Sequence, residues 1–185
     1  MVPQRIKRSK SPEQALSALM RLCARAEKCS GDALRLMRGW GVEPAAQQQV
    51  LRQLQQQRFI DDERYAAAFV REKMRLSGWG GRKIRAALAR KGIAEALIAG
   101  ALAQADPEAA GPRLHEQLVR KARTTRCRTP FELKTKLIRY GLSLGYEYET
   151  VLDEANKLAG DAGPEPCSDC LLYTSPSPRD RSVSR

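Results

Sequence analysis

Hydrophobic residues recur at three- and four-residue intervals along most of the chain, the spacing that places them on one face of an α-helix. The clearest example lies mid-chain, where Tyr65, Phe69 and Val70 follow one side of a helix and Arg71 and Arg75 can face water. Alanine, leucine, arginine and glutamine outweigh valine, isoleucine and threonine, which favours helix over sheet. The pattern therefore predicts an all-α protein.

Several helices carry clear start signals. Asp61 is placed to cap the central helix, because its carboxylate can accept hydrogen bonds from the free amides of the first turn. Asp62 and Glu63 then add negative charge at the positive end of the helix dipole. Ser11 and Thr129, each followed by proline, are expected to cap helices nearer the two ends of the chain. The Asp61–Asp62 pair could in principle bind a metal or act as acid and base, but capping explains it.

A glycine-rich corner ends the central helix. Three glycines lie within positions 78–81, and each lowers helix stability by roughly 1 kcal/mol relative to alanine. The next predicted helix covers 82–91 and stops at Gly92, because glycine suits the left-handed position just past a helix end. Trp79 in the corner is either an anchor packed on its own unit or a stacking contact for a base or partner, and burial preferences favour the anchor.

Gly41, Gly92 and Gly141 lie 51 and 49 residues apart and share the same surroundings. An apolar residue lies four positions before each glycine and another lies one position after it, the spacing of a Schellman helix ending. This recurrence indicates an internal repeat, and we predict three tandem three-helix repeats that form an elongated, curved array. The predicted divisions are a flexible basic arm over 1–12, helical repeats over 13–58, 59–106 and 107–158, and a disordered tail over 159–185.

Both ends of the chain differ from the repeats in composition. The arm over 1–12 is basic and lacks apolar periodicity, and its alternative is an ordinary solubilising terminus. The tail is rich in proline, serine and glycine. From about residue 170 its sequence CLLYTSPSPRD resembles translated sequencing-adapter read-through, and we expect it to be non-native. Cys167 and Cys170 form a lone C-x-x-C, which lacks the four ligands of a structural zinc site.

The chain carries a net charge of +12, from 33 lysines and arginines against 21 acidic residues. This balance fits a partner that bears phosphates or an acidic protein surface. No apolar run is long enough for a signal peptide or a membrane span. Five cysteines without regular spacing fit reduced thiols in a cytosol better than a disulfide framework. We therefore expect a soluble, cytoplasmic monomer that contacts no membrane.

The sequence offers little for catalysis. His115 is the sole histidine, and no serine or cysteine accompanies it in a familiar catalytic motif. The glycines at 78–81 follow a helix rather than a strand, and they lack the G-K-[ST] ending of a phosphate-binding loop. We therefore predict a protein that is not an enzyme and that holds no cofactor or metal.

Two clusters of basic residues stand at equivalent places in the second and third predicted repeats, around the corner between the first and second helices. Each is either a solvated helical face or a contact for a polyanion or an acidic groove. Their recurrence on a strongly basic chain favours the contact. The residues predicted to bind a partner or DNA are Arg71, Lys73, Arg75, Arg82, Lys83, Arg85, Arg90, Lys91, Arg123, Arg126, Lys134 and Lys136.

The middle third of the chain carries a long motif, F-x-D-D-x-R-Y-A-x-x-F-V followed by G-W-G-x-x-K-I-x-x-x-L-x-x-K-G-I, between Phe59 and Ile93. In this motif the chain resembles the RecX family of recombinase regulators. The resemblance implies that the protein binds the RecA recombinase filament on single-stranded DNA and lies in its helical groove. It further implies inhibition of filament growth, ATPase activity and strand exchange, and so a role in modulating recombination, DNA repair and the SOS response.

Two other functions are compatible with the residues. One is a general DNA- or RNA-binding helical protein in which the helix over 82–91 reads a groove. Affinity for bare DNA that falls steeply with salt, without preference for recombinase-coated DNA, would favour it. The other is a scaffold with no link to nucleic acid. For the filament regulator, capping, disassembly and occlusion of the DNA all fit the sequence.

Overall fold

The computed structural model describes residues 9–105 and 110–160, and there the chain forms helices without any strand. The predicted all-α class is confirmed. Most of the predicted basic arm and nearly all of the predicted tail, with Cys167 and Cys170, lie outside these ranges. The helices are α1 (Pro12–Arg25), α2 (Ser30–Gly39), α3 (Pro44–Gln56), α4 (Asp62–Ser77), α5 (Gly81–Arg90), α6 (Glu95–Ala103), α7 (Ala110–Thr124), α8 (Pro130–Leu144) and α9 (Tyr148–Ala159).

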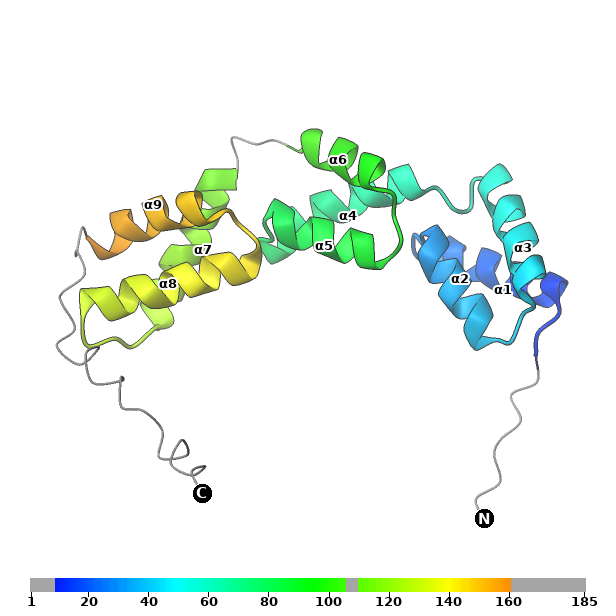
Figure 1. Cartoon of the computed structure of the whole chain (residues 1–185), viewed down its shortest axis with the longest axis horizontal. Helices are drawn as coiled ribbons and strands as arrows, with labels where there is room; N and C mark the ends of the chain where they lie inside the picture. The colour runs from blue at the N-terminus through cyan, green and yellow to red at the C-terminus, as the bar shows by residue number, and fades with distance from the viewer. Residues whose placement is uncertain (1–8, 106–109, 161–185) are drawn as a thin grey trace, which may run out of the picture.

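The helices form three groups along an arch (Figure 1). We call α1–α3 unit one, α4–α6 unit two and α7–α9 unit three. This arrangement confirms the predicted elongated, curved array of three-helix units, while the predicted residue boundaries between them stay a proposal. None of the helices described here is long and apolar enough to cross a membrane.

Each unit surrounds a hydrophobic cluster. Burial of a leucine or isoleucine side chain contributes roughly 1.5–3 kcal/mol, so a few such residues suffice to hold three short helices together. One residue crosses between units. Cys29 directly precedes α2 of unit one, but its side chain is buried in the hydrophobic cluster of unit two. Fully buried side chains include Leu19, Met37 and Leu54 in unit one, Val70, Ile84 and Leu88 in unit two, and Leu118, Leu137 and Val151 in unit three.

Side chains cap the helices where the sequence predicts them. Ser11 Oγ accepts a hydrogen bond from the Gln14 N–H at 3.3 Å, and Gln14 Oε1 accepts one from the Ser11 N–H at 3.2 Å. At the start of α4, Asp61 Oδ1 accepts a hydrogen bond from the Arg64 N–H at 2.9 Å. Thr129 caps α8 in the same way. The first of the paired aspartates is therefore a helix cap.

Two of the three predicted glycine endings are confirmed. Gly41 and Gly92 have φ angles of 71° and 80°, in the left-handed region that glycine adopts without strain. In both turns the N–H of the following apolar residue donates to a carbonyl five positions earlier, at 3.1 and 3.3 Å. These are the hydrogen bonds of a Schellman ending.

The third predicted ending is wrong by one helical turn. Helix α8 continues past Gly141 to Leu144 and is capped by Gly145, whose φ is 88°. Gly141 is buried inside α8, and a Cβ there would lie 2.6 Å from Val151 Cγ1 on α9. The glycine therefore allows α8 and α9 to pack closely, a role that depends on a partner helix and that repeat spacing does not reveal.

Unit one meets unit two through the turn between α1 and α2, a contact that we call joint one. The Ser30 N–H donates to Asp62 Oδ1 at 2.8 Å, so a carboxylate of α4 caps the start of α2. A Cβ on Gly31 would lie 1.7 Å from the Lys91 carbonyl oxygen. The turn of unit one therefore lies backbone against backbone on the turn between α5 and α6.

Unit two meets unit three through the turn between α4 and α5, a contact that we call joint two. The Gly80 N–H donates to the Leu144 carbonyl at 2.8 Å, and the Arg82 N–H donates to the Gly145 carbonyl at 3.1 Å. A Cβ on Gly80 would lie 2.4 Å from the Gly145 carbonyl oxygen. Joint two is therefore also a direct backbone contact that requires a glycine.

Candidate partner interface

The structure divides the predicted binding cations into two groups. One group is held by a carboxylate or by the neighbouring unit, and its members are Lys73, Arg82, Lys83, Arg85, Lys91 and Lys136. The other group has no carboxylate partner among the residues described, and its members are Arg71, Arg75, Arg90, Arg123, Arg126 and Lys134. We call this second group the free cations.

Lys91 belongs to joint one rather than to an open surface. Its Nζ lies 2.7 Å and 3.0 Å from the two carboxylate oxygens of Asp32, and 5.5 Å from the centre of the Tyr65 ring. Burial opposes the charge on the ammonium and is the largest single effect, but the hydrogen bonds and charges of Asp32 and Tyr65 together outweigh it and raise the pKa of Lys91. This lysine therefore holds two units together.

Lys83 and Arg82 belong to joint two. Lys83 Nζ donates to the Ser143 carbonyl at 2.9 Å and lies 4.7 Å from the centre of the Trp79 ring. Arg82 Nη1 lies 3.4 Å from a Glu147 carboxylate oxygen, with both side chains exposed. The half-buried Trp79 ring packs on the core cluster of unit two. Trp79 is therefore a corner anchor, and these cations contact unit three.

The remaining engaged cations form surface ion pairs. Arg85 lies 3.2 Å from Glu95, and Lys73 lies 2.7 Å from its neighbour in sequence, Glu72. Lys136 pairs with a glutamate one turn earlier on α8, and this hydrogen bond raises the Lys136 pKa. Exposed pairs contribute about 0–1 kcal/mol each, so these side chains can exchange their partners for an external anion at little cost.

The free cations of unit two lie on exposed surface. Arg71 and Arg75 are four residues apart on α4 and therefore share a face, opposite the buried Ala66 and Val70. Arg90 lies in the last turn of α5 and is also exposed. Since no carboxylate within residues 9–105 and 110–160 pairs with them, these guanidinium groups are available to phosphate or carboxylate groups of a partner.

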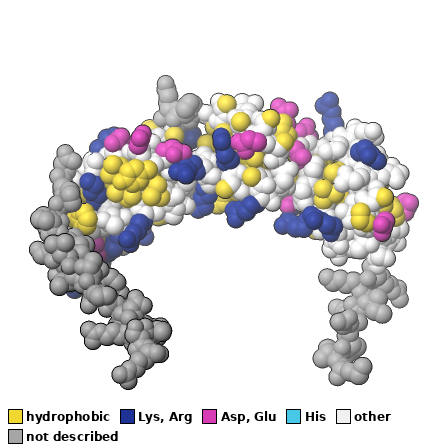
Figure 2. Space-filling model, viewed as in Figure 1, with side chains coloured by type: hydrophobic (Ala, Val, Ile, Leu, Met, Phe, Trp, Pro, Cys, Tyr) yellow, Lys and Arg dark blue, Asp and Glu magenta, His cyan; other side chains and the backbone are white. Residues whose placement is uncertain are grey.

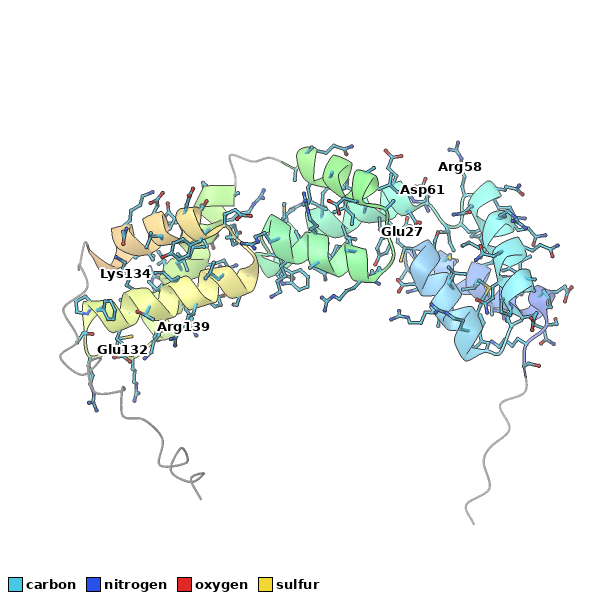
Figure 3. The ribbon with its side chains drawn as sticks, viewed as in Figure 1. Glu27, Arg58, Asp61, Glu132, Lys134 and Arg139 are labelled. Atoms are coloured by element: carbon cyan, nitrogen blue, oxygen red, sulfur yellow. The ribbon has the colours of Figure 1, made fainter. Side chains whose placement is uncertain are left out.

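Charge is unevenly distributed along the arch. In Figure 2, lysine and arginine side chains line the lower, concave edge beneath each unit, whereas the acidic side chains over units two and three lie mainly along the upper edge. In Figure 3, Glu27, Arg58 and Asp61 cluster where unit one meets unit two, and Lys134 and Arg139 lie along α8 at the other end of the arch. The lysine and arginine side chains on the lower edge in Figure 2 therefore extend over more than one unit, whereas the contact between units one and two also carries acidic residues.

An open groove of about 740 Å³ lies beside joint two. Arg82 and Arg85 supply its positive charge, and Met74 and Leu102 supply apolar walls. Glu147 of unit three also lines it. The groove combines guanidinium groups with apolar contact area, a combination that is frequent where one protein binds another.

The potential catalytic groups have structural partners. Asp61 caps α4 and Asp62 caps α2 across joint one. His115 Nδ1 lies 2.8 Å from Glu154 Oε2 on the surface of unit three. No group of three histidine, cysteine, aspartate or glutamate side chains in residues 9–105 and 110–160 is placed to hold a metal ion.

Sequence reasoning missed Asp32 and Glu147, the carboxylates that hold Lys91 and Arg82 at the two joints. Asp32 lies in the first turn of α2, where an acidic residue is expected to interact with the positive end of the helix dipole. Its partner is 59 residues away in the chain. A pattern of neighbouring residues does not reveal a pair so far apart in the sequence. The pair is identified only by the packing of unit one on unit two.

Residues 61–102 match the model of a known domain, described as RecX, second three-helix domain. The chain is 33% identical over 103 residues to the Regulatory protein RecX of Clostridium botulinum (strain Alaska E43 / Type E3), covering 54% of this chain and 47% of that protein. It is 30% identical over 110 residues to the Regulatory protein RecX of Serratia proteamaculans (strain 568), covering 60% of this chain and 64% of that protein. The matched segments thus span about half to two thirds of each relative's length.

Two solved structures share the fold. A crystal structure of regulatory protein RecX superposes with a TM-score of 0.65 at 24% identity, over 75% of this chain and 68% of that one. The crystal structure of RecX from Lactobacillus salivarius gives a TM-score of 0.65 at 19% identity, over 80% of this chain and 96% of that one. At these identities the likeness shows the fold alone. Together with the domain and sequence matches, it confirms the resemblance to the RecX family.

Proposed function

We propose, taking the confirmed resemblance to the RecX regulatory proteins as the premise, that this chain binds a RecA recombinase filament and opposes its growth, ATPase activity and strand exchange. The observation that carries the proposal is that the free cations of unit two lie within the segment that matches the RecX domain. The segment that matches the second RecX domain, 61–102, also contains the free cations Arg71, Arg75 and Arg90. The segment that matches the RecX domain therefore presents positive charge that has no carboxylate partner among the described residues.

The elongated shape supports a filament as the partner. A row of small units with a basic concave edge (Figure 2) can contact several filament subunits, or the DNA phosphates between them, at the same time. Many weak contacts of this kind add up to useful affinity, because each one after the first is intramolecular. The effect on the filament would be steric and electrostatic, with no cofactor and no hydrolysis by this chain.

A strand-exchange assay with the cognate recombinase on single-stranded DNA tests the proposal. We expect substoichiometric amounts of the wild-type protein to inhibit ATP-dependent exchange. Replacing Arg71 and Arg75 with glutamate should raise the concentration for half-inhibition by about tenfold or more, equivalent to a loss of about 1.4 kcal/mol of binding free energy. Lys83 is unsuitable for this substitution because it holds joint two.

The matched control is the double substitution Arg21→Glu/Arg25→Glu. These arginines are also four residues apart and exposed, but they lie on α1 of unit one, outside the matched domain. The control should inhibit much like the wild type. Absence of inhibition by folded wild-type protein, or equal loss in both double variants, would contradict the proposal.

A further inference from the structure

The two joints use the same backbone position of a unit. In joint two, the accepting carbonyl belongs to Leu144, the residue directly before the left-handed Gly145. The donor is the Gly80 N–H, in the turn between the first and second helices of the neighbouring unit. The carbonyl before a left-handed glycine is therefore a docking point for the next unit.

Joint one repeats this geometry. Lys91 directly precedes the left-handed Gly92, and its carbonyl oxygen lies against Gly31 of unit one so closely that a Cβ there would be 1.7 Å away. Gly31 lies in the first turn of α2, so it too belongs to the junction of a first and a second helix. A glycine of one unit thus covers the same carbonyl of its neighbour in both joints.

Unit one has the equivalent surface at Trp40, which directly precedes the left-handed Gly41. No other unit covers it among the residues described. Instead, the Lys10 N–H donates to the Trp40 carbonyl at 3.1 Å. Lys10 Nζ also lies 3.8 Å from the centre of the Trp40 ring, and the Ser9 Cβ would be 3.4 Å from a Cβ on Gly41.

We infer that Ser9 and Lys10 form a strap that occupies the docking surface of unit one in place of a neighbouring unit. At joint two a backbone N–H of the neighbouring unit donates to the equivalent carbonyl, and at joint one the Gly31 backbone lies against it, so the strap takes the place of a docked unit. Release of the strap leaves the Trp40 carbonyl and ring open to a second copy of this chain. The available turn of that copy is the one between α7 and α8, which contacts no neighbouring unit in the described structure.

Such a contact between two copies would be heterologous, because one end of a molecule meets the opposite end of another. Heterologous contacts that do not close into a ring extend into open chains. Repeat arrays generally need their end surfaces covered for this reason. The strap is therefore a cover that keeps the array at three units.

The test uses Lys10→Pro, which removes the N–H donor, in a full-length Trp79→Phe background where Trp40 is the sole tryptophan. Lys10→Ala keeps the N–H and loses only the contact with the ring. Ser9→Pro stiffens the same segment but leaves the Lys10 N–H in place. Ser11, which caps α1, is intact in all three variants, and far-UV circular dichroism checks their helix content.

We expect Trp40 emission to shift to the red and sedimentation velocity to show concentration-dependent association for Lys10→Pro alone. Emission and mass equal to those of both control variants would overturn the strap. A red shift without association would overturn the docking of a second copy. Neither outcome depends on recombinase inhibition, so this proposal and the proposed function can fail separately.

Discussion

Lys91 and Asp32 show how the environment of a single residue decides its role. From the sequence, Lys91 belongs to a basic cluster that is predicted to bind a partner. In the structure it is half-buried against a carboxylate of another unit. Burial alone would raise the pKa of Asp32, but the hydrogen bond and charge of Lys91, with help from Cys29 and Arg35, lower it below its ordinary value of 3.8. The pair therefore links protonation to the coupling of units one and two.

The stability of joint one should depend on pH through this carboxylate. Because the folded-state pKa of Asp32 is depressed, its stabilising effect is fully present above the unfolded-state pKa and is lost as pH falls through the folded-state pKa. We expect Asp32→Asn to lower the unfolding free energy by about 1–3 kcal/mol at neutral pH. The difference from wild type should shrink as pH falls below about 4.

Urea unfolding over a pH series measures both effects. Arg35→Met is the matched control, since Arg35 pairs with the same carboxylate from an exposed position. It should change the unfolding free energy by less than about 1 kcal/mol. A difference between Asp32→Asn and wild type that does not vary with pH would show that the carboxylate contributes nothing through its charge.

At the level of elements, the helices were predictable because their signals are local. Asp61 caps α4 and Gly92 ends the turn after α5 as the sequence predicts, since both act within a few residues of their own position. Gly141 was misread because its role is set by Val151 on another helix. Gly80 was read only as a helix breaker, although it also forms the backbone contact of joint two.

Gly80→Ala should disrupt joint two while unit two itself stays folded. The new Cβ would lie 2.4 Å from the Gly145 carbonyl oxygen and 2.7 Å from the Tyr146 nitrogen, which are backbone atoms that cannot move aside alone. We expect a loss of about 1–3 kcal/mol, as for other overpacked contacts, and a changed maximum dimension in small-angle X-ray scattering.

Gly100→Ala is the comparison, because Gly100 lies inside α6 and its Cβ would meet nothing within 4 Å. That variant should gain up to about 1 kcal/mol from helix propensity and keep the wild-type scattering curve. Identical scattering curves for the two alanine variants would mean that Gly80 does not set the angle between units two and three.

For the whole molecule, the repeat architecture and the basic character were accessible from sequence, but the free cations were not. Net charge and clustering indicate a polyanionic or acidic partner. Which cations face that partner depends on the joints, since Lys83 and Lys91 are held there while Arg71 and Arg75 stay exposed. The unit-to-unit geometry thus selects the binding surface from a larger set of basic residues.

Binding of the fluorescently labelled wild-type chain to recombinase-coated and to bare single-stranded DNA tests the central claim most directly. We expect anisotropy titrations at moderate salt to show at least about tenfold tighter binding to the coated DNA, a difference of about 1.4 kcal/mol or more. Affinity for bare DNA should fall more steeply with salt, because it rests on phosphate contacts alone. Equal or tighter binding to bare DNA would contradict the account and identify a general nucleic-acid-binding protein.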